Sequence, residues 1–205
     1  MSLAAFMEET ASESPAPGGG SVSAYMGAMG AALATMVANL SSHKRGWDER
    51  WEEFSDWAER GKAIQERLLR LVDEDTHAFN EIMAAFGLPK KSHEEQELRK
   101  ATIEAATLHA IEVPLEVMSV ACEGIEVARA MAEAGNPNSV SDAGVGALAL
   151  HACVEGAWLN VKINAVDLDT HPEVTRMLLE GEALRSKASM RKNVVLDLVN
   201  QNFDK

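Results

Sequence analysis

One uncharged stretch places the strongest constraint on how this chain can fold. No Asp, Glu, Lys or Arg occurs from Ser14 to His43. The part from Val22 to Leu40 is long enough to cross a membrane, yet it consists mostly of Ala, Gly, Met and Ser, whose transfer into lipid is only weakly favourable. We therefore expect a buried helix of a soluble protein, in which small residues let another helix approach closely. A membrane-spanning helix is the alternative, and it predicts that the protein leaves the soluble fraction unless detergent is present.

The rest of the chain is predicted to be helical as well. Aromatic residues make up only 5% of the sequence, β-branched residues are sparse, and Ala, Leu, Met and Glu are abundant, a mixture that favours helices. Ser92 with Glu95 and Thr170 with Glu173 form capping boxes, and Pro114 either kinks one helix or separates two. We expect a single domain, residues 1–205, folded as an all-α bundle of long helices at 3–10, 21–42, 47–86, 92–134, 139–168 and 172–203.

Charge and cysteine content exclude several classes of protein. The chain carries 19 Lys and Arg against 32 Asp and Glu, a formal net charge of −13. A generic nucleic-acid binder is excluded, because basic surface supplies most non-specific affinity for phosphate backbones. Cys122 and Cys153 form neither a disulfide framework nor a zinc motif, and the first dozen residues lack the basic start of a secretory signal. We therefore predict a cytoplasmic protein with no nucleic-acid or membrane partner.

A loop rich in proline and glycine precedes the uncharged helix. It has the sequence Pro-Ala-Pro-Gly-Gly-Gly-Ser from Pro15 to Ser21, which is incompatible with a regular element over most of its length. Free N–H groups and the helix dipole at such a helix start favour an anion or an electron-rich carbonyl. Gly18, Gly19, Gly20 and Ser21 are therefore candidate binding residues, although a flexible linker with a helix cap explains the glycines equally well.

Asp75 interrupts an apolar stripe of the long helix predicted at residues 47–86. Apolar or small residues occupy the neighbouring positions of the stripe, Leu71 and Ala78. Burial there would raise the pKa of a carboxyl group toward the range that suits general acid or base catalysis. A structural ion pair with Lys or Arg from another helix is the alternative.

The helix predicted at residues 139–168 has one face of small and polar residues. This face runs through Asp142, Gly146, Ala149, Cys153, Gly156, Asn160, Asn164 and Asp167 at steps of three and four. Either it forms a groove with polar ends, or it packs closely on another helix, with its amides bonded to backbone carbonyls. We favour the groove, because the opposite face already supplies an ordinary core stripe.

A metal site is not expected. Glu74 and His77 match the Glu-x-x-His motif of di-iron bundles, but that site needs the motif twice and the sequence contains it once. The six histidines show no HExxH or His-x₃-His spacing.

Four blocks of sequence occur in a recognisable order. They are PAPGGGS at 15–21 with GA at 27–28 and MVANL at 36–40, LVDEDTHAF at 71–79 with LPK at 88–90, VPL at 113–115, and GN at 135–136 with SDAGV at 141–145 and NVKIN at 160–164. Together they resemble the cyclodeaminase/cyclohydrolase family, which includes formiminotetrahydrofolate cyclodeaminase and a related methenyltetrahydrofolate cyclohydrolase. The resemblance spans nearly the whole chain. It implies an all-helical homodimer whose folate site lies in a cleft close to the subunit interface.

The resemblance also implies an activity. We expect an ammonia-lyase that converts 5-formiminotetrahydrofolate to 5,10-methenyltetrahydrofolate and ammonia, with a tetrahydrofolate derivative as substrate and neither a cofactor nor a metal. Asp75 and Asp142 are the predicted acid and base, in either order. Hydrolysis of methenyltetrahydrofolate to 10-formyltetrahydrofolate is the alternative reaction. A non-catalytic helical dimer that binds folate or scaffolds a partner is the alternative from another class.

The predicted substrate contacts differ in chemistry. Side chains that can hydrogen-bond the pterin ring are Asn39, Asn160 and Asn164, whereas the amides of residues 18–21 can meet a carbonyl or carboxylate. A basic residue could hold the glutamate tail, since an acidic protein needs a local basic patch to attract an anionic ligand; the candidates are Lys44, Arg45 and Lys90. The remaining predicted substrate contacts are Asn136 and Ser141, two residues of the fourth block.

Overall fold

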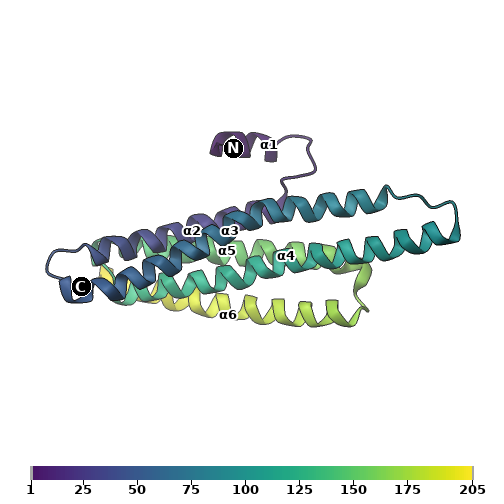
Figure 1. Ribbon diagram of the computed structural model, residues 1–205. Helices are drawn as coiled ribbons and strands as arrows, with labels where there is room; N and C mark the ends of the chain where they lie inside the picture. The colour runs from purple at the N-terminus through teal and green to yellow at the C-terminus, as the bar shows by residue number, and fades with distance from the viewer. Residues whose placement is uncertain (1, 205) are drawn as a thin grey trace.

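The computed structural model describes residues 2–204, and these residues form six α-helices, three short 3₁₀ turns and no strand (Figure 1). The helices are α1 (Leu3–Thr10), α2 (Gly19–Ser42), α3 (Trp51–Phe86), α4 (His93–Ala134), α5 (Val140–Ala165) and α6 (Pro172–Phe203). The prediction of an all-α bundle of long helices is therefore confirmed.

The bundle is arranged around helix α2. Helix α2 packs against α3, α4 and α5, while α6 packs against α4 and α5 on the other side. Helices α3 and α4 form an antiparallel hairpin that projects beyond the other helices at one end of the molecule (Figure 1). Helix α1 lies outside the bundle, where the ring of Phe6 contacts that of Tyr25 at a centroid distance of 5.2 Å.

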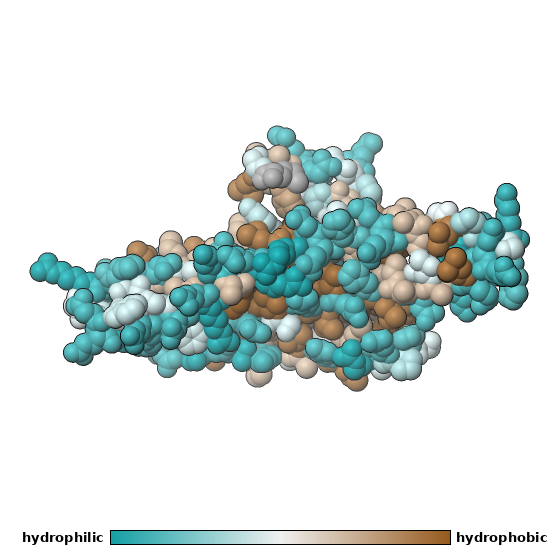
Figure 2. All heavy atoms as spheres, in the orientation of Figure 1, coloured by the Kyte–Doolittle hydropathy of each residue, from teal (hydrophilic) through white to brown (hydrophobic). Residues whose placement is uncertain are grey.

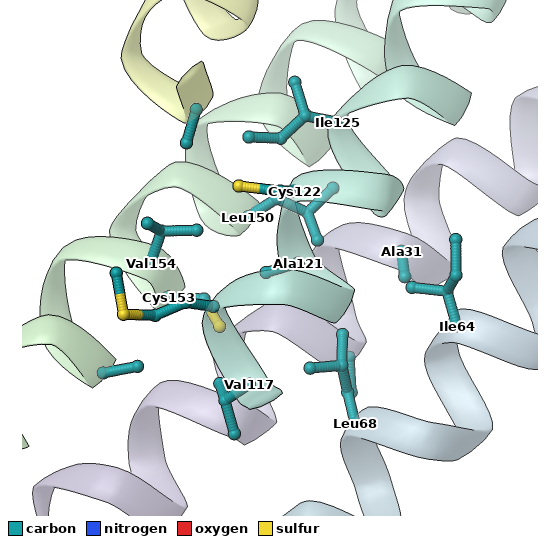
Figure 3. Packing of buried hydrophobic residues seen from close by; sticks show 14 of the residues in the cluster. Ala31, Ile64, Leu68, Val117, Ala121, Cys122, Ile125, Leu150, Cys153 and Val154 are labelled. Carbon is teal, nitrogen blue, oxygen red and sulfur yellow. The ribbon is translucent and has the colours of Figure 1, made fainter. Parts of the chain in front are cut away.

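Close packing of α2 depends on glycine at its contact with α5. A Cβ atom on Gly30 would lie 2.7 Å from the backbone oxygen of Gly146, and one on Gly146 would lie 2.9 Å from the oxygen of Gly30. Both distances are shorter than side chains tolerate, so the two backbones meet directly. Around this contact the core is filled by small and branched side chains, among them Ala31, Leu68, Ala121, Leu150 and Cys153 (Figure 3).

Two helices are apolar and long enough to cross a membrane on length and composition alone. Their best 18-residue windows have a mean hydropathy of 1.4 in α2 and 1.3 in α4. In each window, 56% is buried inside the bundle. Core helices of soluble proteins meet the same criterion, so this finding is weak support for the membrane alternative.

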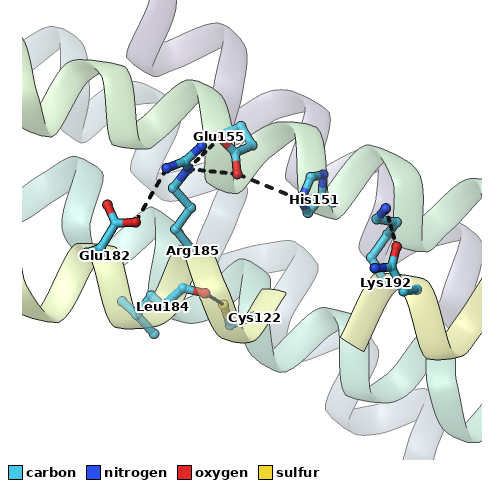
Figure 4. Close-up of polar contacts among 8 residues, drawn as sticks. Cys122, His151, Glu155, Glu182, Leu184, Arg185 and Lys192 are labelled. Atoms are coloured by element: carbon cyan, nitrogen blue, oxygen red, sulfur yellow. Dashed lines mark hydrogen bonds and ion pairs between the residues drawn. The ribbon is translucent and has the colours of Figure 1, made fainter. Parts of the chain in front are cut away.

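Ionic contacts tie the outer helices together at the surface. Arg185 of α6 donates to Glu155 of α5 at 2.7 Å and lies within 3.4 Å of Glu182 (Figure 4). Arg67 of α3 bonds to both Glu74 of its own helix and Glu116 of α4. Such exposed pairs contribute little to stability, so burial of the apolar faces holds the bundle together.

The structure corrects some of the predicted helix boundaries. Helix α2 begins at Gly19, two residues before the expected start at Ser21. Pro114 lies inside one continuous helix, α4, rather than between two. The capping box at Ser92 is confirmed, but α6 is capped by the ring of His171, which accepts from the N–H of Glu173, so the predicted box at Thr170 is wrong.

Candidate active site

A cleft of about 180 Å³ opens where the start of α2 meets α3, α4 and α5. Its lining combines the glycine loop with a carboxylate, two amides and an apolar wall. The residues are Pro15, Ala16, Gly18, Gly19, Gly20, Asp75, Ala78, Phe79, Ile82, Ala110, Asn160 and Asn164. The structure thus brings together three segments that were predicted separately: the glycine loop, the Asp75 stripe and the far end of the α5 face.

Asp75 is the only ionisable side chain in the cleft lining, and it meets the first turn of α2. The Oγ of Ser21 donates to its Oδ2 at 2.7 Å, and lies 3.3 Å from the Oγ1 of Thr76. Burial raises the pKa of Asp75 above its ordinary value, while hydrogen bonds from the side chain and backbone of Ser21 partly offset that rise. Within residues 2–204 Asp75 forms no ion pair, unlike its neighbour Glu74, whose pKa is lowered by Arg67.

Glycine at position 20 is required for this arrangement. A Cβ on Gly20 would come within 2.0 Å of the Oδ1 of Asp75, well inside the contact distance of any two heavy atoms. The carboxylate therefore lies directly against the backbone of α2, where the helix presents unsatisfied N–H groups and the positive end of its dipole. The glycine run is part of the site and not a flexible linker.

The two amides of α5 are oriented by backbone carbonyls. The Nδ2 of Asn160 donates to the oxygen of Gly156 at 2.9 Å, and the Nδ2 of Asn164 donates to the oxygen of Ala110 at 2.6 Å. The oxygen of Ala110 is the one that Pro114 cannot reach with a backbone N–H, because proline has none. Each NH₂ group uses one of its two N–H donors in this bond, and the carbonyl oxygens of both amides have no partner among residues 2–204 and can accept from a ligand.

This arrangement can bind a flat, polar heterocycle and move a proton. The amide oxygens of Asn160 and Asn164 suit ring N–H groups, and Phe79 and Ile82 supply an apolar wall. A carboxyl group whose pKa is raised above its ordinary value is a stronger base when ionised and keeps its proton to higher pH, which suits proton transfer. The N–H groups at the start of α2 favour electron-rich atoms of the ligand.

Lys90 lies outside the cleft, in the loop between α3 and α4, and the remaining predicted site residues lie at the opposite end of the bundle. Asn39 is 19 residues beyond Gly20 on α2, about 28 Å along the helix, and Asp142 precedes Asn160 by 18 residues on α5, about 27 Å. Asn39 therefore does not join the other amides at the cleft of its own chain. Nor does Asp142 join Asp75, so a catalytic role for Asp142 would require a second chain.

A second depression, of about 320 Å³, lies at that opposite end. It is lined by Ser42, His43, Lys44, Arg45, Asp48, Trp51 and Ser55. Lys44 lies over the ring of Trp47, with Nζ 3.9 Å from the centroid. Asn136 lies nearby, because its N–H donates to the Oγ of Ser41 at 2.8 Å. Ser141 is exposed in the first turn of α5 at the same end.

The predicted groove along α5 is filled over most of its length. Besides the contact at Gly146, a Cβ on Gly156 would come within 2.3 Å of the Oγ of Ser23, and Cys153 is fully buried beside Gly27. Close packing on α2 therefore explains the small residues, and only the end at Asn160 and Asn164 opens into a cleft. The expectation of a groove is wrong for the rest of this face.

Three residues of the cleft lining were not predicted from the sequence to belong to the site: Phe79, Ile82 and Ala110. Phe79 and Ile82 read as ordinary apolar positions of a long helix. Ala110 could have been found from Pro114, since a proline inside a helix leaves the carbonyl four residues earlier without its usual donor. Among residues 2–204 no three His, Cys, Asp or Glu side chains lie close enough to hold a metal ion.

Comparisons with known proteins agree on one family. The model of a family described as formiminotransferase-cyclodeaminase matches residues 2–182. A protein of Methylorubrum extorquens named methenyltetrahydrofolate cyclohydrolase is 37% identical over 199 residues, which cover 97% of this chain and 96% of that protein. The formimidoyltransferase-cyclodeaminase of Rattus norvegicus is 36% identical over 177 residues, which cover 85% of this chain.

The structural comparison covers the whole fold. The crystal structure of formiminotetrahydrofolate cyclodeaminase from Thermotoga maritima matches with a TM-score of 0.87 and 29% identity over 98% of this chain and 96% of that one. By contrast, the alignment with the Rattus norvegicus protein covers only 33% of that protein's length. The relatives therefore include proteins of this size and a much longer one.

Replacing Ser21 by Ala should raise the pKa of Asp75 further. The substitution removes the hydroxyl that donates to Oδ2 and so leaves the ionised carboxylate less well solvated. Carbon-detected NMR titration of ¹³C-labelled aspartate in both proteins measures the change. An unchanged or lower pKa of Asp75 would contradict this account of the site.

Proposed function

The chain belongs to the formiminotransferase-cyclodeaminase family, and from this we propose that it converts 5-formiminotetrahydrofolate to 5,10-methenyltetrahydrofolate and ammonia. The observation that supports the proposal most directly is Asp75, a half-buried carboxyl group that forms no ion pair within residues 2–204, in a cleft that also offers amides and free helix N–H groups. Members of this family are enzymes of folate one-carbon chemistry. The reaction as proposed needs neither a metal nor a cofactor.

The proposed cyclisation requires the transfer of one proton from N10 to the leaving amino group. The formimino group enters protonated, as an amidinium, so attack of the N10 nitrogen on its carbon gives a tetrahedral carbon that carries a neutral amino group, with the positive charge on N10–H. The proton on N10 must then reach that amino group, which leaves as ammonia while the N5–C–N10 bridge becomes the methenyl cation. A carboxylate between the two nitrogens can take the proton from N10 and deliver it to the leaving amine, ending as it began. We assign this role to Asp75.

The neighbours of Asp75 suit the rest of the substrate. Asn160 and Asn164 accept hydrogen bonds from the pterin, and Phe79 and Ile82 exclude water from one side of the ring. We expect the N–H groups at Gly19 and Gly20 to face an electron-rich atom of the substrate rather than the carbon that becomes cationic, because a helix start favours negative charge. In this arrangement the glycine loop positions the substrate and keeps Asp75 close to the backbone of α2.

Hydrolysis of methenyltetrahydrofolate to 10-formyltetrahydrofolate is the second candidate reaction. It is favoured by the Methylorubrum extorquens relative, whose name carries that activity and which matches over nearly its whole length. Water would add to the same carbon, and the tetrahedral intermediate would carry a hydroxyl in place of the amino group. Asp75 would then act as the base that takes the proton from water.

A non-catalytic role agrees less well with the site. A purely structural carboxylate at this depth would be expected to pair with Lys or Arg, and the pairing observed nearby belongs to Glu74 instead. We also propose that the protein works in the cytoplasm without a membrane, because the uncharged helix α2 already packs against three helices of its own chain.

We further propose that two copies pair through an exposed face formed by α2 and α5. The side chains of this apolar face are Met29, Leu33, Met36 and Leu40 of α2 with Val145 and Leu148 of α5. Leu33 lies beside Gly146 at the contact between the two helices, so the two stripes adjoin. The α2 part carries no charged residue, so a two-fold axis through it brings no like charges together.

Such pairing would also explain the split set of predicted site residues. If the two α2 helices run in opposite directions across the axis, the end of one copy that holds Lys44, Arg45 and Asp142 approaches the end of the other that holds Asp75. Residues that lie about 28 Å apart on one chain would then serve a single ligand. This is the arrangement in which Asn39, Asn136 and Ser141 could still contact substrate.

Purified protein supplied with 5-formiminotetrahydrofolate should form the methenyl absorbance band and release an equal amount of ammonia. Absorbance and an ammonia assay run on the same sample measure both products. No change with this substrate, together with consumption of added methenyltetrahydrofolate, would replace the proposal with the cyclohydrolase. Inactivity toward both substrates would remove the enzymatic proposal.

Replacing Asp75 by Asn should lower kcat by a factor of about 10² to 10⁴, the usual contribution of a general acid or base. The fold should persist, because Asn keeps the shape of Asp and can still accept from Ser21. Steady-state kinetics and circular dichroism check the two statements. Asp73→Asn, which neutralises an exposed carboxylate on the same helix, is the control and should retain activity. Normal turnover in Asp75→Asn would remove Asp75 from the mechanism.

The wild-type protein should be a dimer in solution, and Leu33→Glu with Met36→Glu should make it a monomer. The two new carboxylates would face their symmetry mates across an apolar contact, which is unfavourable without a partner charge. Light scattering coupled to size exclusion measures the mass. Leu179→Glu, at a residue of α6 that is 71% exposed, should leave the dimer intact. A monomeric wild type would refute the proposed pairing.

A further inference from the structure

We propose that the projecting α3–α4 hairpin of this chain binds the carboxylates of the substrate's glutamate tail, through a basic pocket formed by Lys90, Arg99 and Lys100. This inference rests on the proposed function, because it takes a folate derivative as the ligand of the cleft. It assigns the tail to one of the two basic sites that the sequence left open, the other being Lys44 and Arg45.

Every ionisable side chain that lines the pocket is positively charged. The pocket has a volume of about 300 Å³ and is lined by Lys90, Gln96, Arg99, Lys100 and Ile103. Within residues 2–204 none of the three cations forms an ion pair, although Arg67, Arg129 and Arg185 each do so elsewhere. The nearby Glu95 is occupied in capping α4, where it accepts from the N–H groups of Lys91 and Ser92. Although residues 90–104 carry four Glu as well as four Lys and Arg, the pocket lining itself contains only positive ionisable side chains, which attract an anion to this place.

Arg99 is held in position and has an unused donor. Its Nη2 donates to the carbonyl oxygen of Phe86 at 3.2 Å, and its guanidinium lies 5.7 Å from the centroid of the Phe86 ring. Its Nε is buried and has no hydrogen-bond partner among the described residues. Buried donors without an acceptor are costly and uncommon. A carboxylate in the pocket would supply an acceptor to a guanidinium that is already oriented.

Apolar side chains of α3 and α4 lie between this pocket and the cleft. On α3, Phe79 and Ile82 line the cleft, and Phe86 lies one turn further along the same side. On α4, Ala110 lines the cleft and Ile103, two turns earlier, lines the basic pocket. Figure 2 shows hydrophobic atoms gathered beside hydrophilic ones on the projecting end of the molecule. A benzoyl group can pack on these apolar side chains, beside the contact of 2.8 Å between Glu81 of α3 and His109 of α4.

The spacing favours a tail of more than one glutamate. Arg99 lies eleven residues before Ala110, about 16 Å along α4. With the pterin between Asp75 and the amides, the aminobenzoyl group packs on these apolar side chains and its first glutamate reaches the edge of the pocket. Further γ-linked glutamates would place their carboxylates among the three cations. The hairpin is then a determinant of tail length, separate from the chemistry at Asp75.

The test uses p-aminobenzoyl-tri-γ-glutamate, which has the tail but neither a pterin nor a one-carbon unit. The wild-type protein should bind it in isothermal titration calorimetry, and Arg99→Gln and Lys100→Gln should each weaken binding about tenfold, the usual value of a lost charge-assisted hydrogen bond. The Michaelis constant for the triglutamate substrate should rise in the same variants by more than that for the monoglutamate. The control is Lys62→Gln, which removes an exposed charge on α3 far from the projecting end of the hairpin. This variant should bind the probe as the wild type does.

Several results would overturn the proposal. It fails if the wild type does not bind the probe, or if Lys44→Gln with Arg45→Gln abolishes binding while the hairpin variants retain it. Lys100 is exposed, so its variant decides the question even if Arg99→Gln does not fold. Because the probe undergoes no reaction, binding without turnover would refute the proposed function alone. Turnover with unchanged binding in the hairpin variants would refute the tail site alone.

Discussion

The structure depends on an uncharged helix of small residues that lies inside the bundle. Because α2 has glycine where it meets α5, the two backbones touch at Gly30 and Gly146, and the helices on either side come closer than larger side chains would allow. This packing directs the start of α2 toward α3, α4 and α5 instead of into solvent. The N–H groups that every helix start leaves unsatisfied are therefore available inside a cleft, which is where a ligand can use them.

The buried position of Asp75 lowers the stability of the fold when the carboxyl group is ionised, and it suits the proposed proton transfer. Since burial raises its pKa, the folded protein holds this proton more tightly than the unfolded chain does. By linkage, the free energy of unfolding contributed by Asp75 is greatest at low pH and decreases as the pH rises from the unfolded to the folded pKa. Above that interval the ionised carboxylate destabilises the fold, and Ser21 only partly compensates. A buried carboxyl group that destabilises the fold when ionised, and that pairs with no cation among the described residues, is a candidate for proton transfer.

Much of the fold could be predicted from the sequence, because helices and caps are local. Residue spacing identified the helices, and the misfit of Asp75 in an apolar stripe identified the centre of the cleft. The small-residue face of α5 was misjudged, since spacing alone cannot tell an open groove from a close contact, and only the position of Gly30 on another helix decides it. Asn39 and Asp142 were grouped with Asp75 because their chemistry matched, but distance along long helices separates them. Long-range placement of this kind is not encoded in any single segment.

The geometry also changes what the mechanism needs. From the sequence, an acid and a base seemed necessary, and Asp142 was assigned as the second carboxylate. Yet in cyclisation with loss of ammonia the proton that leaves N10 is the one that the departing amine requires, so one carboxyl group between the two nitrogens suffices. Under the proposed mechanism, the single carboxylate in the described cleft is therefore sufficient. The polar residues at the far end of α2 are then free to hold other parts of a ligand, and across a two-fold axis they would do so for the neighbouring copy.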